Sequence, residues 1–227
     1  MSDGDFFREV DEAVRQDRLK TLWDRYGIFV LAAAVLLVAG VAGYRGWEYW
    51  QAERSAESGA RFMEALQLTE DGKTDEALKA YQEVLEDGTG GYALLARFRL
   101  AAAAAKSGDK AGAVAAYDAL AKDGSAGKIF QGLAKIQAAT LRVDQADMGE
   151  MKDRLDGLTD AANPWRHSAR ELLGLAAHRI GDNAEAQRHF TDIMRDPEAP
   201  PNLRRRAEIM LALVVKADAP AANANAK

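Results

Sequence analysis

The sequence predicts an all-α protein: one N-terminal transmembrane helix followed by an α-solenoid of about four helical hairpins plus a capping helix. Alanine, the strongest helix former, supplies a large share of the apolar residues. A stretch of 19 residues near the N-terminus, 26–44, carries no charged side chain. The chain that follows repeats a glycine, alanine and aromatic pattern with a period of about 36 residues. These three observations predict the fold class.

Composition excludes several classes of function. The 227 residues carry a formal net charge of −5 with acids and bases interspersed, which is unlike the basic surface of a nucleic-acid-binding protein. The chain has no cysteine, so disulfides, thiol catalysis and cysteine zinc sites are excluded. It also contains none of the usual serine-hydrolase, zinc-protease or phosphate-loop motifs. We therefore expect a protein that is not an enzyme and uses no cofactor or metal.

The leader, residues 1–25, is highly charged but carries an apolar stripe. Phe6, Val10 and Val14 follow one another at intervals of four, which places them on one face of a helix. Asp3 or Asp5 would cap the start of that helix. We expect a short amphipathic helix that lies at the membrane surface and leads into the span. The alternative is a helix that docks to a cytoplasmic or membrane partner.

Residues 26–44 predict the transmembrane helix. At 1.5 Å per residue they cover nearly all of the roughly 30 Å hydrocarbon core. Arg25 and Arg45 bracket the stretch, and aromatic residues flank both ends, as is typical of membrane interfaces. The alternatives are a buried core helix and a signal peptide cleaved near residues 40–42. The symmetric flanks argue against the first, and the acidic leader and the length of the apolar stretch against the second.

Lysine and arginine counts on the two sides of the span predict its orientation. Residues 11–25 hold four such side chains and residues 45–59 hold two. The excess favours a cytoplasmic N-terminus, because positive charge is retained inside. We therefore expect a single-pass protein of the bacterial inner membrane, with residues 45–216 forming a periplasmic domain.

The periplasmic domain is predicted to consist of repeats. A glycine is followed five residues later by alanine and four residues after that by an aromatic residue. The glycine would end the first helix of a hairpin in a left-handed conformation, the alanine would allow the two helices to approach closely, and the aromatic residue would fill the space between hairpins. The three copies are Gly72, Ala77 and Tyr81; Gly108, Ala113 and Tyr117; and Gly181, Ala186 and Phe190.

The remaining elements follow from this repeat. A weak copy at Ala146, Met151 and Leu155 keeps the spacing but not the residue types. First helices are expected at about 55–70, 92–107, 128–143 and 165–180, and a capping helix at 202–216. Residues 217–227 hold no core-forming residue and are expected to be disordered. The N-caps of the second helices are expected at Thr74 or Asp75, at Asp109, and at Asp182 or Asn183.

The repeat resembles the tetratricopeptide repeat, whose period is 34 residues. Arg97 and Arg170 stand near the position of its first-helix tryptophan, so the resemblance is to a divergent member. The leader FFREVDEAVRQDRLKTLWDRYG runs directly into the span. In this respect the whole layout resembles the YfgM-like family, ancillary subunits of the SecYEG translocon, in its alphaproteobacterial type.

The family resemblance carries implications about function. It implies an accessory translocon subunit that links SecYEG to a periplasmic chaperone for newly exported proteins. The repeat domain is also akin to that of a cell-division coordinator. An envelope scaffold that coordinates cell division or cell-wall synthesis is therefore the alternative.

Stacked hairpins present their first helices on one curved face, which suits binding of peptide segments. The side chains expected there, beyond those the core needs, are mainly basic, so a partner with an acidic segment is predicted. Of the three histidines, His167 and His178 would lie on one helix about 16 Å apart, too far to share a metal. His189 on the partner helix leaves one bridging pair geometrically possible, but no carboxylate motif lies nearby and no metal is expected. The candidate partner-binding residues are Arg61, Arg97, Arg99, Lys128, Gln131, Lys135, Arg166 and Arg170.

Overall fold

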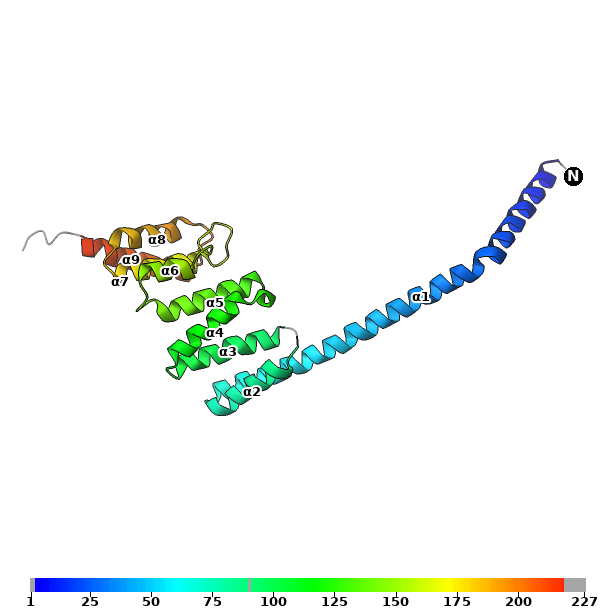
Figure 1. Ribbon diagram of the computed structural model, residues 1–227. Helices are drawn as coiled ribbons and strands as arrows, with labels where there is room; N and C mark the ends of the chain where they lie inside the picture. Colours follow the sequence, from blue (N-terminus) through cyan, green and yellow to red (C-terminus); the bar gives the residue numbers. More distant parts are fainter. Residues whose placement is uncertain (1–2, 90, 219–227) are drawn as a thin grey trace, which may run out of the picture. The chain divides into compact units, whose positions relative to one another are not determined.

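The computed structural model describes residues 3–89 and 91–218, with side chains for residues 23–29, 31–89 and 91–216. Every secondary-structure element within these ranges is a helix, which confirms the predicted all-α class. The chain divides into two compact units, residues 1–57 and residues 58–227 (Figure 1). Each unit is described separately below.

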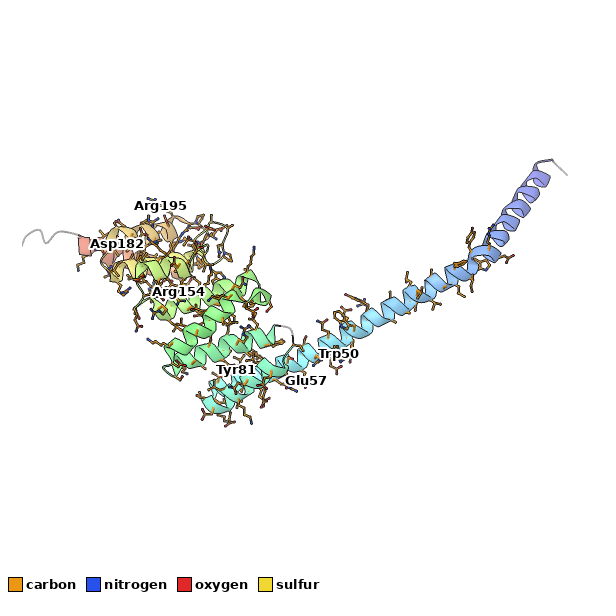
Figure 2. All side chains as sticks on the ribbon, viewed as in Figure 1. Trp50, Glu57, Tyr81, Arg154, Asp182 and Arg195 are labelled. Atoms are coloured by element: carbon orange, nitrogen blue, oxygen red, sulfur yellow. The ribbon has the colours of Figure 1, made fainter. Side chains whose placement is uncertain are left out.

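The first unit consists of the N-terminal part of α1 (Asp3–Glu70), so the leader and the apolar stretch belong to one helix. Among the residues that the structure describes, one helix is long and apolar enough to cross a membrane, and it is this one. The described side chains of residues 31–54 are all exposed, as lipid-facing side chains would be in the absence of lipid. Arg54 lies over the ring of Trp50, 4.8 Å from its centroid (Figure 2). The predicted leader stripe at Phe6, Val10 and Val14 lies outside the described side chains.

The second unit is a stack of antiparallel hairpins (Figure 1). Residues 58–70 of α1 form the first helix of the first hairpin; this helix ends at Glu70 as expected but has no start at residue 55, because α1 is continuous from Asp3. The other three expected first helices and the capping helix agree with the structure to within two residues. The second helix of the third hairpin is short. The helices after α1 are α2 (Thr74–Asp87), α3 (Tyr92–Lys106), α4 (Lys110–Lys122), η1 (Gly124–Ala126, one 3-10 turn), α5 (Gly127–Arg142), α6 (Met148–Arg154), α7 (Arg166–Arg179), α8 (Asn183–Arg195) and α9 (Pro201–Asp218).

The hairpin turns explain the positions of the repeat glycines. Gly72, Gly108 and Gly181 have φ angles of 77°, 98° and 81°, a left-handed conformation that costs glycine little. Asp109 accepts a hydrogen bond from the Gly112 amide at the start of α4 and thereby caps that helix.

Of the other two expected N-caps, one is confirmed and one is wrong. Asp182 caps α8 by accepting a hydrogen bond from the Glu185 amide, as expected. The expected cap at Thr74 or Asp75 is wrong, because the N-cap of α2 is Lys73 and no side chain caps it. The capping helix α9 extends to Asp218, two residues into the segment expected to be disordered; residues 219–227 lie outside the described chain.

The core is divided among the hairpins. Four clusters of buried apolar residues lie between successive helices, from the contact of α1, α2 and α3 to the contact of α7, α8 and α9. The alanine and aromatic residues of the three predicted copies are all buried. The weak copy follows the same rule, since Ala146, Met151 and Leu155 are each at most 1% exposed. Each hairpin therefore buries its apolar surface mainly against its neighbours.

Candidate protein-binding surfaces

Several glycines of the first helices lie directly against an aromatic ring, Gly174 and Gly132 among them. A Cβ atom on Gly174 of α7 would lie 2.8 Å from Cζ of Phe190 of α8. A Cβ atom on Gly132 of α5 would lie 2.4 Å from Cδ1 of Trp165, whose Nε1 donates a hydrogen bond to the Ile129 carbonyl at 3.0 Å. Both distances are shorter than any ordinary carbon contact. Close packing at these points sets how tightly the helices stack.

In each of three hairpins, an arginine of the first helix forms an ion pair with an aspartate at the end of the second helix. We call these pairs the arginine–aspartate ties. The arginine precedes the aspartate by 26 residues each time. An acid at a helix C-terminus opposes the helix dipole, so the arginine offsets an unfavourable charge. The pairs are Arg61 with Asp87 at 4.0 Å, Arg97 with Asp123, and Arg170 with Asp196 at 3.8 Å.

The aspartates of the second and fourth hairpins also cap the turn that follows. Asp123 accepts hydrogen bonds from the amide and the hydroxyl of Ser125. The Ser125 hydroxyl and the Arg97 guanidinium together lower the pKa of Asp123 to about 2. Asp196 in the same way accepts a hydrogen bond from the Glu198 amide at 3.0 Å. These aspartates hold the loop that leads to the next hairpin.

The fourth hairpin has the densest set of ion pairs. Nε of Arg166 donates to Asp196 at 2.8 Å, and a second guanidinium nitrogen reaches Glu198 at 2.5 Å. Nε2 of His167 lies 2.8 Å from the same Asp196 carboxylate. Arg166 and then the Glu198 amide hold the pKa of Asp196 well below its usual range. This cluster fixes the start of α7 to the loop between α8 and α9.

The structure gives the eight candidate partner-binding residues different environments. Arg61, Arg97 and Arg170 belong to the ties described above, and Arg166 is buried in the Asp196 cluster. Gln131 donates to the Asp123 carbonyl at 2.9 Å and Lys135 to the Asp156 carbonyl at 3.1 Å. Arg99 and Lys128 are exposed. Six of the eight candidate residues, five of them basic, therefore make contacts within the chain.

A partly buried charge network joins α4, α5 and α6. Arg142 of α5 and Arg154 of α6 both donate to Glu150 at 2.8 Å, and Arg154 also reaches Asp118 of α4 at 2.6 Å. Arg154 is labelled in Figure 2. The two guanidinium groups, Arg142 first, lower the pKa of Glu150 to about 2. These ion pairs hold the short α6 against α4 and α5. Because the positive and negative charges compensate one another, the network presents no strong electrostatic field to a ligand.

An apolar hollow of about 570 Å³ lies where α5, α7 and α9 meet. Two of its lining residues, Arg206 and Glu171, form an ion pair with nitrogen–oxygen distances of 2.6 and 2.7 Å. None of the eight candidate residues lines the hollow. Its walls are formed by Ile136, Thr140, Ser168, Glu171, Leu172, Leu175, Arg206, Ile209 and Met210. Its apolar walls suit the side chains of a peptide or helix better than a charged ligand.

The histidines do not form a shared site. Nδ1 of His178 lies 3.3 Å from the Asn183 amide oxygen, and Nε2 of His189 lies 3.3 Å from Glu185. Burial lowers the pKa of His189. Among the described residues, no three His, Cys, Asp or Glu side chains lie close enough together to hold a metal ion.

Two features of these surfaces had a sequence signal that the sequence analysis missed. The first is the 26-residue spacing of arginine and aspartate, which occurs three times. The second is Asp147, which accepts a hydrogen bond from the Glu150 amide and caps α6. An aspartate three residues before a glutamate is a recognisable helix start. The hollow has no such signal, because its residues come from three separate helices.

The profile of a family described as "Tetratricopeptide repeat-like domain" matches residues 20–210. No curated protein and no solved structure matches the chain.

Proposed function

Because the chain belongs to the tetratricopeptide repeat-like domain family, we propose that it is a membrane-anchored module that binds other proteins in the bacterial periplasm. Domains of this family are typically protein-interaction modules and not enzymes. The observation that carries the proposal is the combination of an apolar helix long enough to span a membrane with a repeat domain that has an open apolar hollow. Tetratricopeptide-like stacks of this kind bind extended or helical segments of their partners.

The proposed partners are the SecYEG translocon and a periplasmic chaperone, in an accessory role for newly exported proteins. Support comes from the layout of charged leader, single span and divergent repeats, which resembles the YfgM-like family. An anchor would tether the repeat domain to the membrane from which exported chains emerge. The second candidate, an envelope scaffold for cell division or wall synthesis, requires the same anchor and the same hollow but different partners.

The orientation of the span is tested first. The chain has no native cysteine, so a single cysteine reports one position without background. Ser125→Cys in the repeat domain should react with a membrane-impermeant thiol reagent added to cells with a permeabilised outer membrane. Gln16→Cys in the leader should react only after the inner membrane is broken. The reverse pattern would place the repeat domain in the cytoplasm and reject the proposal.

The partners are tested by crosslinking from the hollow. A photoreactive amino acid at Ile209, which is exposed at the hollow, should capture its occupant in growing cells. The same amino acid at Glu83, exposed on α2, is the matched control. Translocon subunits and a chaperone captured only from Ile209 support the first proposal. Division or wall-synthesis proteins captured there support the second, and identical products from both positions would argue against the hollow as a binding site.

A further inference from the structure

His189 of α8 is a buried titratable group near the contact between the third and fourth hairpins. Its side chain is 8% exposed, and its Nε2 atom has no hydrogen-bond partner among the described residues. The other two histidines differ, because a ring nitrogen of His167 reaches Asp196 and one of His178 reaches Asn183. A buried polar atom without a partner costs free energy, so a histidine at this position weakens the fold unless it has another role.

One carboxylate oxygen serves both His189 and two cations. Oε1 of Glu185 lies 3.3 Å from Nε2 of His189, one turn later on α8. The same oxygen lies 2.6 Å from a guanidinium nitrogen of Arg188, also on α8, and 3.5 Å from Nζ of Lys152 on α6. The ion pair of Lys152 with Glu185 is therefore a link between the third hairpin and the fourth, and His189 stands beside it.

The environment of His189 keeps its ring neutral at neutral pH. Burial and then the charge of Arg188 lower the pKa of His189, against smaller opposite effects of Glu185 and Asp192. The other helices pack on α8 mainly through apolar residues; the one titratable side chain that bonds α8 from α7 is His178, at Asn183 in the first turn. The apolar contacts come from Met148 of α6, Ala177 of α7, and Leu203, Ala207 and Val214 of α9.

A proton on His189 would place a third cation on one carboxylate. Burial penalises the charged ring, and its attraction to Glu185 competes with the two ion pairs already present. Lys152 is the cation held least firmly, because its side chain is 56% exposed and its distance to Glu185 is the longest of the three. Protonation is therefore expected to strengthen the contact of His189 with Glu185 inside α8 and to release Lys152, and with it α6.

We propose that His189 makes the contact between the third and fourth hairpins sensitive to acid, so that α6 loosens from α8 when the ring takes up a proton. With seven residues, α6 is the shortest second helix of the described chain and the one most easily released. The third hairpin supplies one wall of the hollow, Ile136 and Thr140 of α5, and the other walls belong to α7 and α9. Acid should therefore also weaken binding in the hollow. This consequence rests on the proposed function, whereas the loosening of α6 does not.

The lowered pKa of His189 fixes the direction and the upper limit of the effect. The packed ring binds a proton less readily than a ring in water, whose pKa is 6.5, so the contact loses stability as the pH falls through 6.5. At about pH 5.5 a ring in water is protonated roughly ten to one, so the population of the opened state rises by at most about tenfold. Glu185 keeps its charge over this range, because burial alone would raise its pKa but Arg188, His189 and Lys152 together lower it.

Hydrogen exchange of the full chain in a mild detergent, followed by mass spectrometry, tests the loosening of α6. Between about pH 7.5 and about pH 5.5 the amides of α6, residues 148–154, should exchange about three- to tenfold faster, once the intrinsic pH dependence of exchange is removed. The amides of α2, residues 74–87, lie in the first hairpin and are the internal control. Their corrected rates should change by less than about twofold.

Three variants assign the response to its residues. His189→Gln has a polar side chain that takes up no proton, so the acid response of α6 should disappear, whereas the matched control His178→Gln should retain it. Lys152→Gln removes the cation that acid is expected to release, so α6 should exchange faster already at about pH 7.5 and respond less to acid. Thermal melts monitored by circular dichroism verify folding, and the exposed Lys152 decides the test if His189→Gln does not fold.

Three results would overturn the inference: an acid response of α6 that persists in His189→Gln, a response of α2 as large as that of α6, or equal responses in Lys152→Gln and the native chain. Crosslinking from Ile209 at the two pH values separates the inference from the proposed function. Loosening of α6 without any specific crosslink would reject the proposed function and leave the inference standing. Specific crosslinks that acid does not weaken would reject the consequence for the hollow.

Discussion

Gly174 lies directly beneath the ring of Phe190, and this contact allows a quantitative test of the packing. A Cβ atom at position 174 would stand 2.8 Å from Cζ and 2.9 Å from Cε1 of Phe190. Carbon atoms normally approach to about 3.5–4.0 Å, so the ring would have to move by roughly 0.7 Å. Phe190 has no exposed surface and little freedom to do so. Gly174→Ala is therefore expected to destabilise the domain although alanine favours helices.

The size of the effect follows from two opposing contributions. Replacing glycine by alanine within a helix gains up to about 1 kcal/mol in helix propensity. Forcing extra volume into a packed core costs about 1–3 kcal/mol. We expect a net loss of about 1 kcal/mol in the free energy of unfolding, which lowers the melting temperature by about 2–4 °C in a domain of this size.

Phe190→Leu supplies the control, because leucine leaves space for the added methyl group. In that background Gly174→Ala should no longer destabilise and should recover part of its propensity gain of up to about 1 kcal/mol. The resulting coupling of about 2 kcal/mol is within the range found for residues in contact. Urea unfolding of the four full-length variants in detergent, followed by circular dichroism, measures it. Equal effects of Gly174→Ala in both backgrounds would refute the reasoning.

Three further predictions concern single contacts. The pKa of Glu150 is about 2 in the folded protein against an ordinary 4.5. The charge of Glu150 therefore stabilises the fold above pH 4.5, and this contribution is lost as the pH falls to about 2. Between these pH values the melting temperature should fall less steeply in Glu150→Gln than in the native chain. Gly108 has a φ of 98°, so Gly108→Ala should lower the free energy of unfolding by about 1–2 kcal/mol in urea titrations, and Gly108→Asn should cost less. If Arg97 and Asp123 stabilise each other, the double variant Arg97→Gln/Asp123→Asn should lose less stability than the two single variants summed, and strict additivity would contradict the tie.

Much of the fold could be predicted from the sequence because its determinants are local. A glycine at a turn, an alanine at a close approach and an aromatic residue one turn later specify a hairpin within a few residues of one another. For this reason the expected helix at 92–107 agrees with Tyr92–Lys106, and that at 165–180 with Arg166–Arg179. The N-cap of α2 was predicted wrongly because Thr74 is a good cap by residue type, whereas the helix begins one residue earlier than a cap at Thr74 requires.

The candidate binding surfaces were harder to predict because they depend on contacts between distant residues. Helical periodicity placed Arg166 on a first helix, but its burial depends on Asp196, 30 residues later in the chain. A basic residue that looks like a free ligand in the sequence can thus be part of the scaffold. The hollow collects Ile136, Leu172 and Ile209 from three helices, and only the stacking of the hairpins brings these side chains together.

The short α6 has a consequence for how the domain loses its structure. The other second helices have 13 or 14 residues, whereas α6 has seven, and Ala134 and Asp160 stand where the other hairpins have their arginine and aspartate. In a stack whose units contact mainly their neighbours, cooperativity passes through each unit in turn. The third hairpin is therefore expected to be the least stable unit of the stack. Its amides should exchange with deuterium first, and the segments before and after it should then open as two separate foldons.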